Sequence, residues 1–143
     1  MNIQYRQIKR PYSFLSPFKG AEFAALVYIE DTDITIEEQN ALSDQLVTSG
    51  CRYAVCAGHN CSSWDDSIDM ADIKRNDGAV NDDNLVMTTW HENEPLKDIV
   101  FHYLNNTSFG NFAANWLLVL VVGDNESTLE NIRNEIKKQL SLD

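Results

Sequence analysis

Residues Phe23–Ile29 read Phe-Ala-Ala-Leu-Val-Tyr-Ile, an almost unbroken apolar run with β-branched and aromatic members. A run of this length and composition is typical of a strand buried on both faces of a sheet. Such strands occur mainly in parallel sheets that helices cover on both sides. Trp116–Val122, which reads WLLVLVV, is a second and more apolar run of this kind. The two runs predict buried strands of a parallel sheet.

Helical signals lie between the apolar runs. Thr35-Ile36-Glu37-Glu38 is a capping box, because the Thr35 hydroxyl can accept from the Glu38 amide while the Glu38 side chain reaches back. Two further strands are expected at Tyr53–Ala57 and Leu85–Trp90. The expected helices cover Ile36 to Val47, Trp64 to Ala71 opened by Ser62 or Ser63, Pro95 to Leu104, and Ser127 to Leu140.

Strands and helices alternate regularly, which predicts a three-layer α/β fold. The sheet is expected to be mainly parallel and four-stranded, with helices on both faces in a Rossmann-like arrangement of right-handed crossovers. The chain has 143 residues, the length of one domain. We assign residues 22–143 to a single α/β domain. Residues 1–21 form a basic and aromatic N-terminal arm that packs on it, as an irregular arm or a short edge strand.

Charge is divided unevenly along the chain. There are 22 acidic and 11 basic residues, which gives a net charge of −11. Residues 1–21 contain four basic residues and no acid, so the α/β domain alone carries a net charge of −15. Nucleic acid and anionic membranes would repel this domain, and we expect neither as a partner. The partner that the charge favours is a basic protein.

Composition also bears on the compartment and on cofactors. The longest apolar run has seven residues, far below the ~20 that a membrane-spanning helix needs. The first residues lack the apolar stretch of a secretory signal. The number of cysteines, three, is odd, which fits free reduced thiols better than a set of disulfides. We therefore expect a cytoplasmic protein. A glycine-rich phosphate loop is missing, so no cofactor is expected, and the oligomeric state stays open.

Polar residues follow each predicted strand, at the edge where open α/β sheets form their sites. After the first strand, residues 31–35 read Asp-Thr-Asp-Ile-Thr and match the D-x-D-x-T motif of the haloacid-dehalogenase phosphatases. This interpretation is disfavoured, because Thr35 already caps a helix. Gly58-His59 also ends the second strand, where a Ser or Thr would have to hold the phosphate.

Two kinds of reactive site are weighed at the same edge. His59, Cys61 and His91 form a weak candidate set for zinc. A thiol site would use Cys61 at a helix N-terminus, which lowers a thiol pKa, with His91 as its base. Asp65 and Asp66 would oppose the thiolate. Buried thiols and surface histidines are the ordinary alternatives to both sites.

The second predicted helix carries the most distinctive string in the chain. Residues 61–69 read Cys-Ser-Ser-Trp-Asp-Asp-Ser-Ile-Asp, and Asp65, Asp69 and Asp72 recur at helical spacing to make one acidic face. With Met87–His91 (MTTWH) and the Ser-Gly-Cys-x-Tyr string at 49–53, this segment resembles an uncharacterised bacterial domain family of unknown function. The resemblance spans roughly residues 23–105 and implies a bacterial cytosolic protein without an assigned activity. The positions that it singles out are Cys61, Trp64, Asp65, Asp66, Asp69, Trp90 and His91.

Two functions remain open. The first is a small acidic binding protein that docks a basic partner, as an immunity or antitoxin-type inhibitor of a nucleic-acid-cleaving toxin does. Its expected binding residues are Trp64, Asp65, Asp66, Asp69, Asp72, Trp90 and His91. The alternative is a small enzyme or ligand-binding domain, possibly a metal-dependent hydrolase, at the carboxyl ends of the strands. Its candidate residues are His91, Cys61, Asp65 and Asp66, with His91 as general acid or base.

Overall fold

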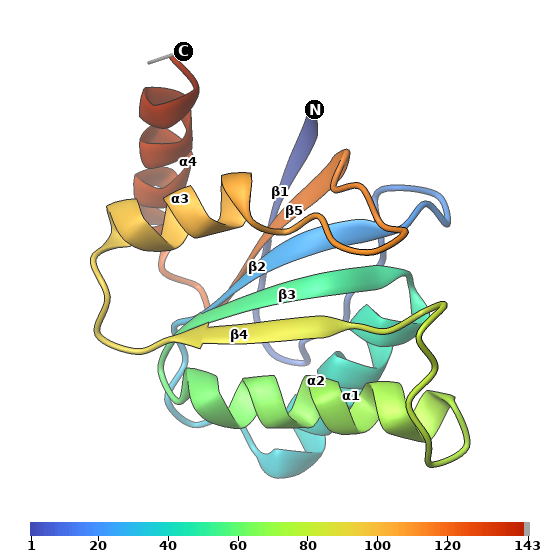
Figure 1. Cartoon of the computed structure of the whole chain (residues 1–143). Coiled ribbons are helices and arrows are strands. Elements are labelled where there is room, and N and C mark those ends of the chain that lie inside the picture. The colour runs from blue at the N-terminus through green and yellow to red at the C-terminus, as the bar shows by residue number, and fades with distance from the viewer. Residues whose placement is uncertain (142–143) are drawn as a thin grey trace.

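A computed structural model describes residues 1–141 (Figure 1). These residues form five strands and four helices. In chain order the elements are β1 (Asn2–Ile8), β2 (Phe23–Ile29), α1 (Ile36–Thr48), β3 (Cys51–Gly58), α2 (Cys61–Arg75), β4 (Met87–His91), α3 (Leu96–Asn105), β5 (Trp116–Val122) and α4 (Glu126–Leu140). None of these helices is long and apolar enough to cross a bilayer.

The strands form one parallel sheet in the order β1-β5-β2-β3-β4. The predicted four-stranded sheet is therefore wrong by one strand, which lies in the segment that we expected to be an irregular arm or a short edge strand. Residues Asn2–Ile8 pair in register with Trp116–Val122 and form one edge of the sheet. The predicted count left out β1 because its sequence, Asn-Ile-Gln-Tyr-Arg-Gln-Ile, is polar and only half-buried, as suits an edge strand.

Helices cover both faces of the sheet, as the alternation predicted. One face packs against α1 and α2, with Leu42, Leu46, Trp64 and Ile68 in its core. The other packs against α3 and α4, and its core includes Ile99, Val100, Tyr103, Ile132 and Ile136. Figure 1 shows α3 and α4 above the sheet and α1 and α2 below it, with β4 at the near edge.

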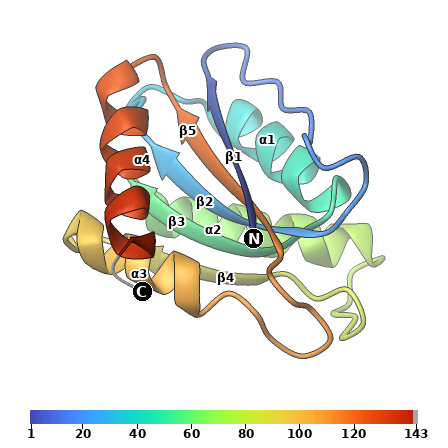
Figure 2. The same ribbon diagram turned by 90° about the horizontal axis from the view of Figure 1, so that it is seen from above.

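Residues 9–22, between β1 and β2, are irregular and pack on the α1 side of the sheet. Figure 2 shows this segment, in blue, running past α1. Its aromatic residues Tyr12, Phe14 and Phe18 are buried in the core. Arg10 forms ion pairs with Glu38, at 2.7 Å, and with Asp33, at 3.4 Å. Through Arg10, the segment therefore binds acidic residues of its own chain.

Helix α1 begins as predicted. The Thr35 hydroxyl accepts from the Glu38 amide at 3.1 Å, and the Glu38 carboxylate accepts from the Thr35 amide at 3.0 Å. Helix α2 begins one residue before the expected Ser62. Its N-cap, Asn60, has a left-handed backbone and no side-chain capping bond. This start places Cys61 and Trp64 in the core while Asp66 faces outward.

Candidate functional site

The crevice between β2 and β5 is where open α/β sheets usually bind ligands, because the strand order reverses there. Here the chain fills it. The Tyr12 hydroxyl donates to the Asp31 carboxylate, and the Thr128 hydroxyl donates to Glu30. A Cβ on Gly123 would lie 2.7 Å from the Cβ of Glu30, so even a methyl group has no room. Asp31, the first residue of the D-x-D-x-T string, is thus occupied by a tyrosine.

Strand β4 carries the Thr-Thr-Trp-His string and separates two polar clusters. Its register with β3 pairs Thr88 with Ala54 and His91 with Ala57. Ala54 belongs to the core on the α1–α2 side, whereas Ala57 belongs to the core on the α3–α4 side. Successive side chains of a strand point to opposite faces, so Thr88 and Trp90 face α2 while Thr89 and His91 face α3.

The acidic cluster lies on the α2 side and consists of Asp65, Asp66 and Asp69. The Thr88 hydroxyl donates to Asp69 Oδ1 at 2.7 Å, which joins the two distinctive strings of the sequence directly. Asp65 is only 5 % exposed, and its Oδ1 has no hydrogen-bond partner among residues 1–141. Burial raises the pKa of Asp65 and of Asp69, and neighbouring carboxylates add to both shifts. Asp66 is exposed.

Asp72 lies on the same helix but is engaged within the chain. Its carboxylate is 2.5 Å from the Arg75 guanidinium and accepts from the Val86 amide at 3.1 Å. It is buried, with an exposed fraction of 3 %. Asp72 therefore holds the loop between α2 and β4, and of the four predicted aspartates only Asp66 and Asp69 can reach a partner.

The two predicted aromatic anchors differ sharply. Trp64 is buried, with 2 % of its surface exposed, and it plugs the core beneath α2. Trp90 is 53 % exposed, on the same side of β4 as Thr88. A half-exposed tryptophan is typical of binding surfaces. Of the two predicted anchors, only Trp90 is accessible, whereas Trp64 packs in the core beneath α2.

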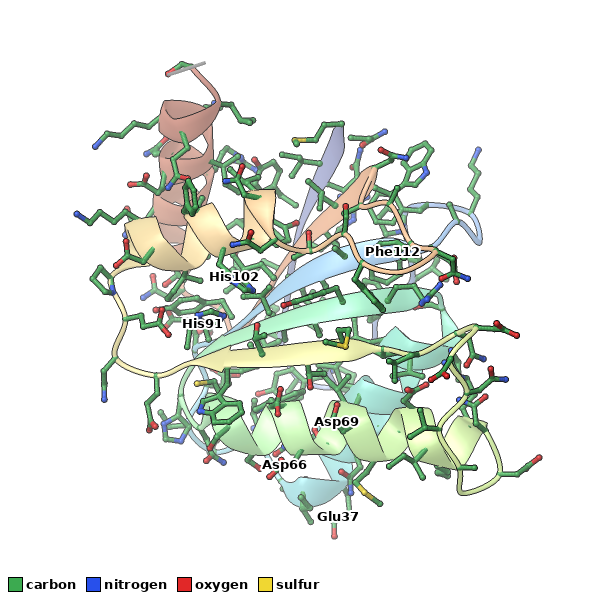
Figure 3. All side chains as sticks on the ribbon, viewed as in Figure 1. Glu37, Asp66, Asp69, His91, His102 and Phe112 are labelled. Carbon is green, nitrogen blue, oxygen red and sulfur yellow. The ribbon has the colours of Figure 1, made fainter. Side chains whose placement is uncertain are left out.

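The histidine cluster lies on the α3 side, and four of its members were not predicted. His91 Nδ1 is 3.0 Å from Glu94 Oε2, and its Nε2 is 3.0 Å from the Thr89 hydroxyl. The imidazole of His102, on α3, lies 4.8 Å from that of His91 between ring centroids. Tyr53 OH is 3.0 Å from His102 Nε2. Figure 3 shows His91 and His102 together above the sheet, and Asp66 and Asp69 on the helix below it.

The contacts of His91 hold its ring in one orientation. Glu94 orients the His91 ring, and the other ring nitrogen faces a hydroxyl, which is the arrangement that activates a nucleophile in hydrolases. Burial, together with the neighbouring His91, lowers the pKa of His102. Burial raises the pKa of Tyr53. Both shifts keep the His102–Tyr53 pair neutral near neutral pH.

Several predicted combinations are not assembled. The His91 ring and the acidic cluster lie on opposite faces of the sheet, so Asp65 and Asp66 cannot tune this histidine. Cys61 is buried, and burial raises the pKa of its thiol, which disfavours the thiolate. His59 is exposed. No group of three His, Cys, Asp or Glu side chains within residues 1–141 is placed to hold a metal ion, so His59, Cys61 and His91 do not form one.

Sequence reasoning could have found part of the histidine cluster. The strand was predicted at Leu85–Trp90, and the observed β4 extends to His91. Adjacent residues of a strand face opposite ways, so Trp90 and His91 cannot share a site within one strand. Glu94, three residues after His91, lies within its reach in a tight connection. Tyr53 and His102 come from other elements and give no such signal.

Comparison with known proteins yields a family and no activity. A search of curated proteins finds no match for this chain. A family model described as "Domain of unknown function (DUF7684)" matches residues 3–139, which include the strings at 61–69 and 87–91 and, apart from Asn2, all five strands. The chain belongs to the DUF7684 family.

Proposed function

We propose that this protein is a small acidic binding module that docks a basic protein through Trp90 and the acidic cluster. The observation that carries the proposal is the half-exposed Trp90 on the face of β4 where Thr88 binds Asp69. An aromatic anchor on the same face as carboxylates matches the side chains that dominate binding energy, which include arginine on the partner's side. A basic, nucleic-acid-cleaving toxin is the partner class that we favour, and nucleic acid or a membrane is not.

Local charge supports the same surface. The two cations of α2 are already engaged, because Lys74 pairs with Asp44 at 3.4 Å and Arg75 pairs with Asp72. By contrast, Asp66, Asp69 and Glu92 form no salt bridge with any residue of the described part of the chain. Their charge is therefore available to a cationic partner, which it would attract over a Debye length of roughly 8 Å at physiological salt.

We also propose that the fold is a Rossmann-like variant in which the usual crevice is closed. The strand order β4-β3-β2-β5 has the reversal between β2 and β5 that such folds use for nucleotides. Tyr12, Glu30 and Gly123 occupy that place here. This supports a binding role carried by the β4 side of the molecule.

The proposed docking is tested with matched charge variants. A double variant, Asp66→Asn with Asp69→Asn, removes two charges from the acidic cluster. The control, Asp124→Asn with Glu130→Gln, removes two charges beside and on α4. A basic protein captured from a native lysate should be lost in the double variant and in high salt, and kept by the control. Equal capture by both variants would contradict the acidic cluster as the docking surface.

A second candidate function rests on the contacts of His91. With Glu94 at one ring nitrogen and the Thr89 hydroxyl at the other, His91 has the geometry of a general base for acyl transfer. A screen with activated esters tests this: His91→Gln should lose about 10²–10⁴-fold of any turnover, the range that general acid–base catalysis contributes. Turnover that is equal in wild type and His91→Gln would remove this candidate.

A further inference from the structure

The edge formed by β4 is open to another strand. Strand β4 is the last of the sheet and pairs on one side only, with β3. On its other side, no described residue forms a hydrogen bond with the backbone of Met87–Trp90. A strand edge of this kind presents unpaired N–H and C=O groups that can bind an extended segment.

The two edges of the sheet are treated differently. On β1 the Arg6 guanidinium donates to the Tyr5 carbonyl at 2.9 Å, so a cation lies on that edge. Charged residues on edge strands are a common device against pairing with other chains. Strand β4 reads Met-Thr-Thr-Trp-His, without lysine, arginine or proline, and Met87 and Trp90 are exposed on opposite faces of it. The β4 edge thus has no cationic residue of its own to prevent pairing with another strand.

We infer that β4 takes an extended, cationic segment of the basic partner as a sixth strand of the sheet. This inference rests on the docking function proposed above and specifies how the partner binds. Backbone bonds to β4 would supply affinity, and alternate side chains of the added strand would face the two sides of the sheet. Cationic side chains are placed toward Trp90, Asp66 and Asp69, where a guanidinium can stack on the indole.

The side chains on the other face of the added strand point toward the α3 side of the sheet. There the exposed Met87 side chain lies on the α3 side, in register with Tyr53. An apolar residue fits beside it. The structure therefore assigns to the partner a segment in which arginine or lysine alternates with apolar residues.

Charge decides between this partner and a second copy of the chain. Two copies joined through β4 would each bring Asp66, Asp69 and Glu92 to the same interface, with no salt bridge to neutralise them. Each copy also carries a net charge of −11. Like charges placed together across an interface disfavour association, whereas a cationic segment is attracted.

The test uses a short synthetic peptide in which arginine alternates with valine, titrated against the full chain. Two further peptides carry N-methyl groups, one on every arginine and the other on every valine. Along a strand, alternate N–H groups point to opposite edges, so only one of the two sets can face β4. We expect one methylated peptide to bind at least about tenfold more weakly than the parent and the other to bind equally well.

Three results overturn the inference. Equal affinities for all three peptides would show that charge alone binds them. If the double variant, Asp66→Asn with Asp69→Asn, then lowered the affinity for all three peptides, the docking function would stand without strand addition. Absence of binding by the parent peptide at millimolar concentration would exclude strand addition, while the capture experiment tests docking separately. A peptide-free dimer, with β4 amides protected from hydrogen exchange, would make a second copy the occupant.

Discussion

On the α2 side of β4 the polar groups are carboxylates with one hydroxyl, whereas on the α3 side they are two imidazoles, a phenol, a hydroxyl and one carboxylate. The same five-residue strand supplies both sides. Burial raises the pKa of the aspartates on one side and lowers the pKa of His102 on the other. Burial therefore favours the neutral form on each face, and the two faces must respond to acid in opposite directions.

The largest effect is expected at the base of the acidic cluster. Trp64→Ala should lower the free energy of unfolding by about 3–5 kcal/mol, because it removes the largest fully buried side chain and leaves a cavity. Chemical denaturation measures this loss. A loss below 1 kcal/mol would mean that α2 does not depend on this anchor, and the histidine cluster should keep its His91–His102 contact by NMR in either case.

A smaller loss is expected where Asp72 connects α2 to β4. Asp72→Ala should cost about 1–3 kcal/mol, because the Arg75 guanidinium and the Val86 amide lose their acceptor. The same denaturation experiment applies, with Asp66→Ala as the exposed control. If both variants lose equal stability, Asp72 does not hold the loop in the manner that its contacts indicate.

Titration separates the two faces most directly. The pKa of Asp65 is raised on folding, so the folded state binds more protons, and the cost of burying this carboxylate grows as pH rises above about 4, the unfolded value. Asp65→Asn should therefore stabilise the protein at neutral pH, by about 1 kcal/mol, and lose this advantage in acid. An advantage independent of pH would contradict the raised pKa.

His102 should show the reverse dependence. Its pKa is lowered on folding, so the stability linked to the neutral ring is present above about pH 6.5 and is lost as pH falls toward the folded pKa. Denaturation of His102→Gln at several pH values should lack this loss, and an NMR titration of the ring should place its pKa below that of an unfolded control. A ring that titrates above the control would refute the assignment.

The smallest effect on stability is expected at the exposed tryptophan. Trp90→Ala should change the free energy of unfolding by no more than about 0.5 kcal/mol, as most surface substitutions do. It should also weaken the binding of the arginine–valine peptide to the protein. Trp64→Ala should therefore lower mainly the stability, whereas Trp90→Ala should lower mainly the affinity for the peptide. A large loss of stability in Trp90→Ala would instead make this residue part of the α2 packing.

The sequence predicted the interior of the fold better than its edges. The capping box at Thr35 and the apolar strands are local patterns, and the structure contains them. Strand β1 and the histidine cluster depend on pairings that no local pattern shows: Asn2 with Trp116, and Tyr53 with His102. The Asp69–Thr88 bond, which joins the two distinctive strings, follows from the register of α2 against β4. Spacing along the chain contains no such information.

The pairing of β1 with β5 has a kinetic consequence. The first strand of the chain must wait for Trp116–Val122, more than a hundred residues later, before it gains a neighbour. During synthesis, β2, α1 and β3 can associate while Asn2–Ile8 stays unpaired and exposed, and closing so long a loop slows folding. Charged residues on an edge strand oppose pairing with other chains, so Arg6 opposes such pairing for as long as this strand has no neighbour.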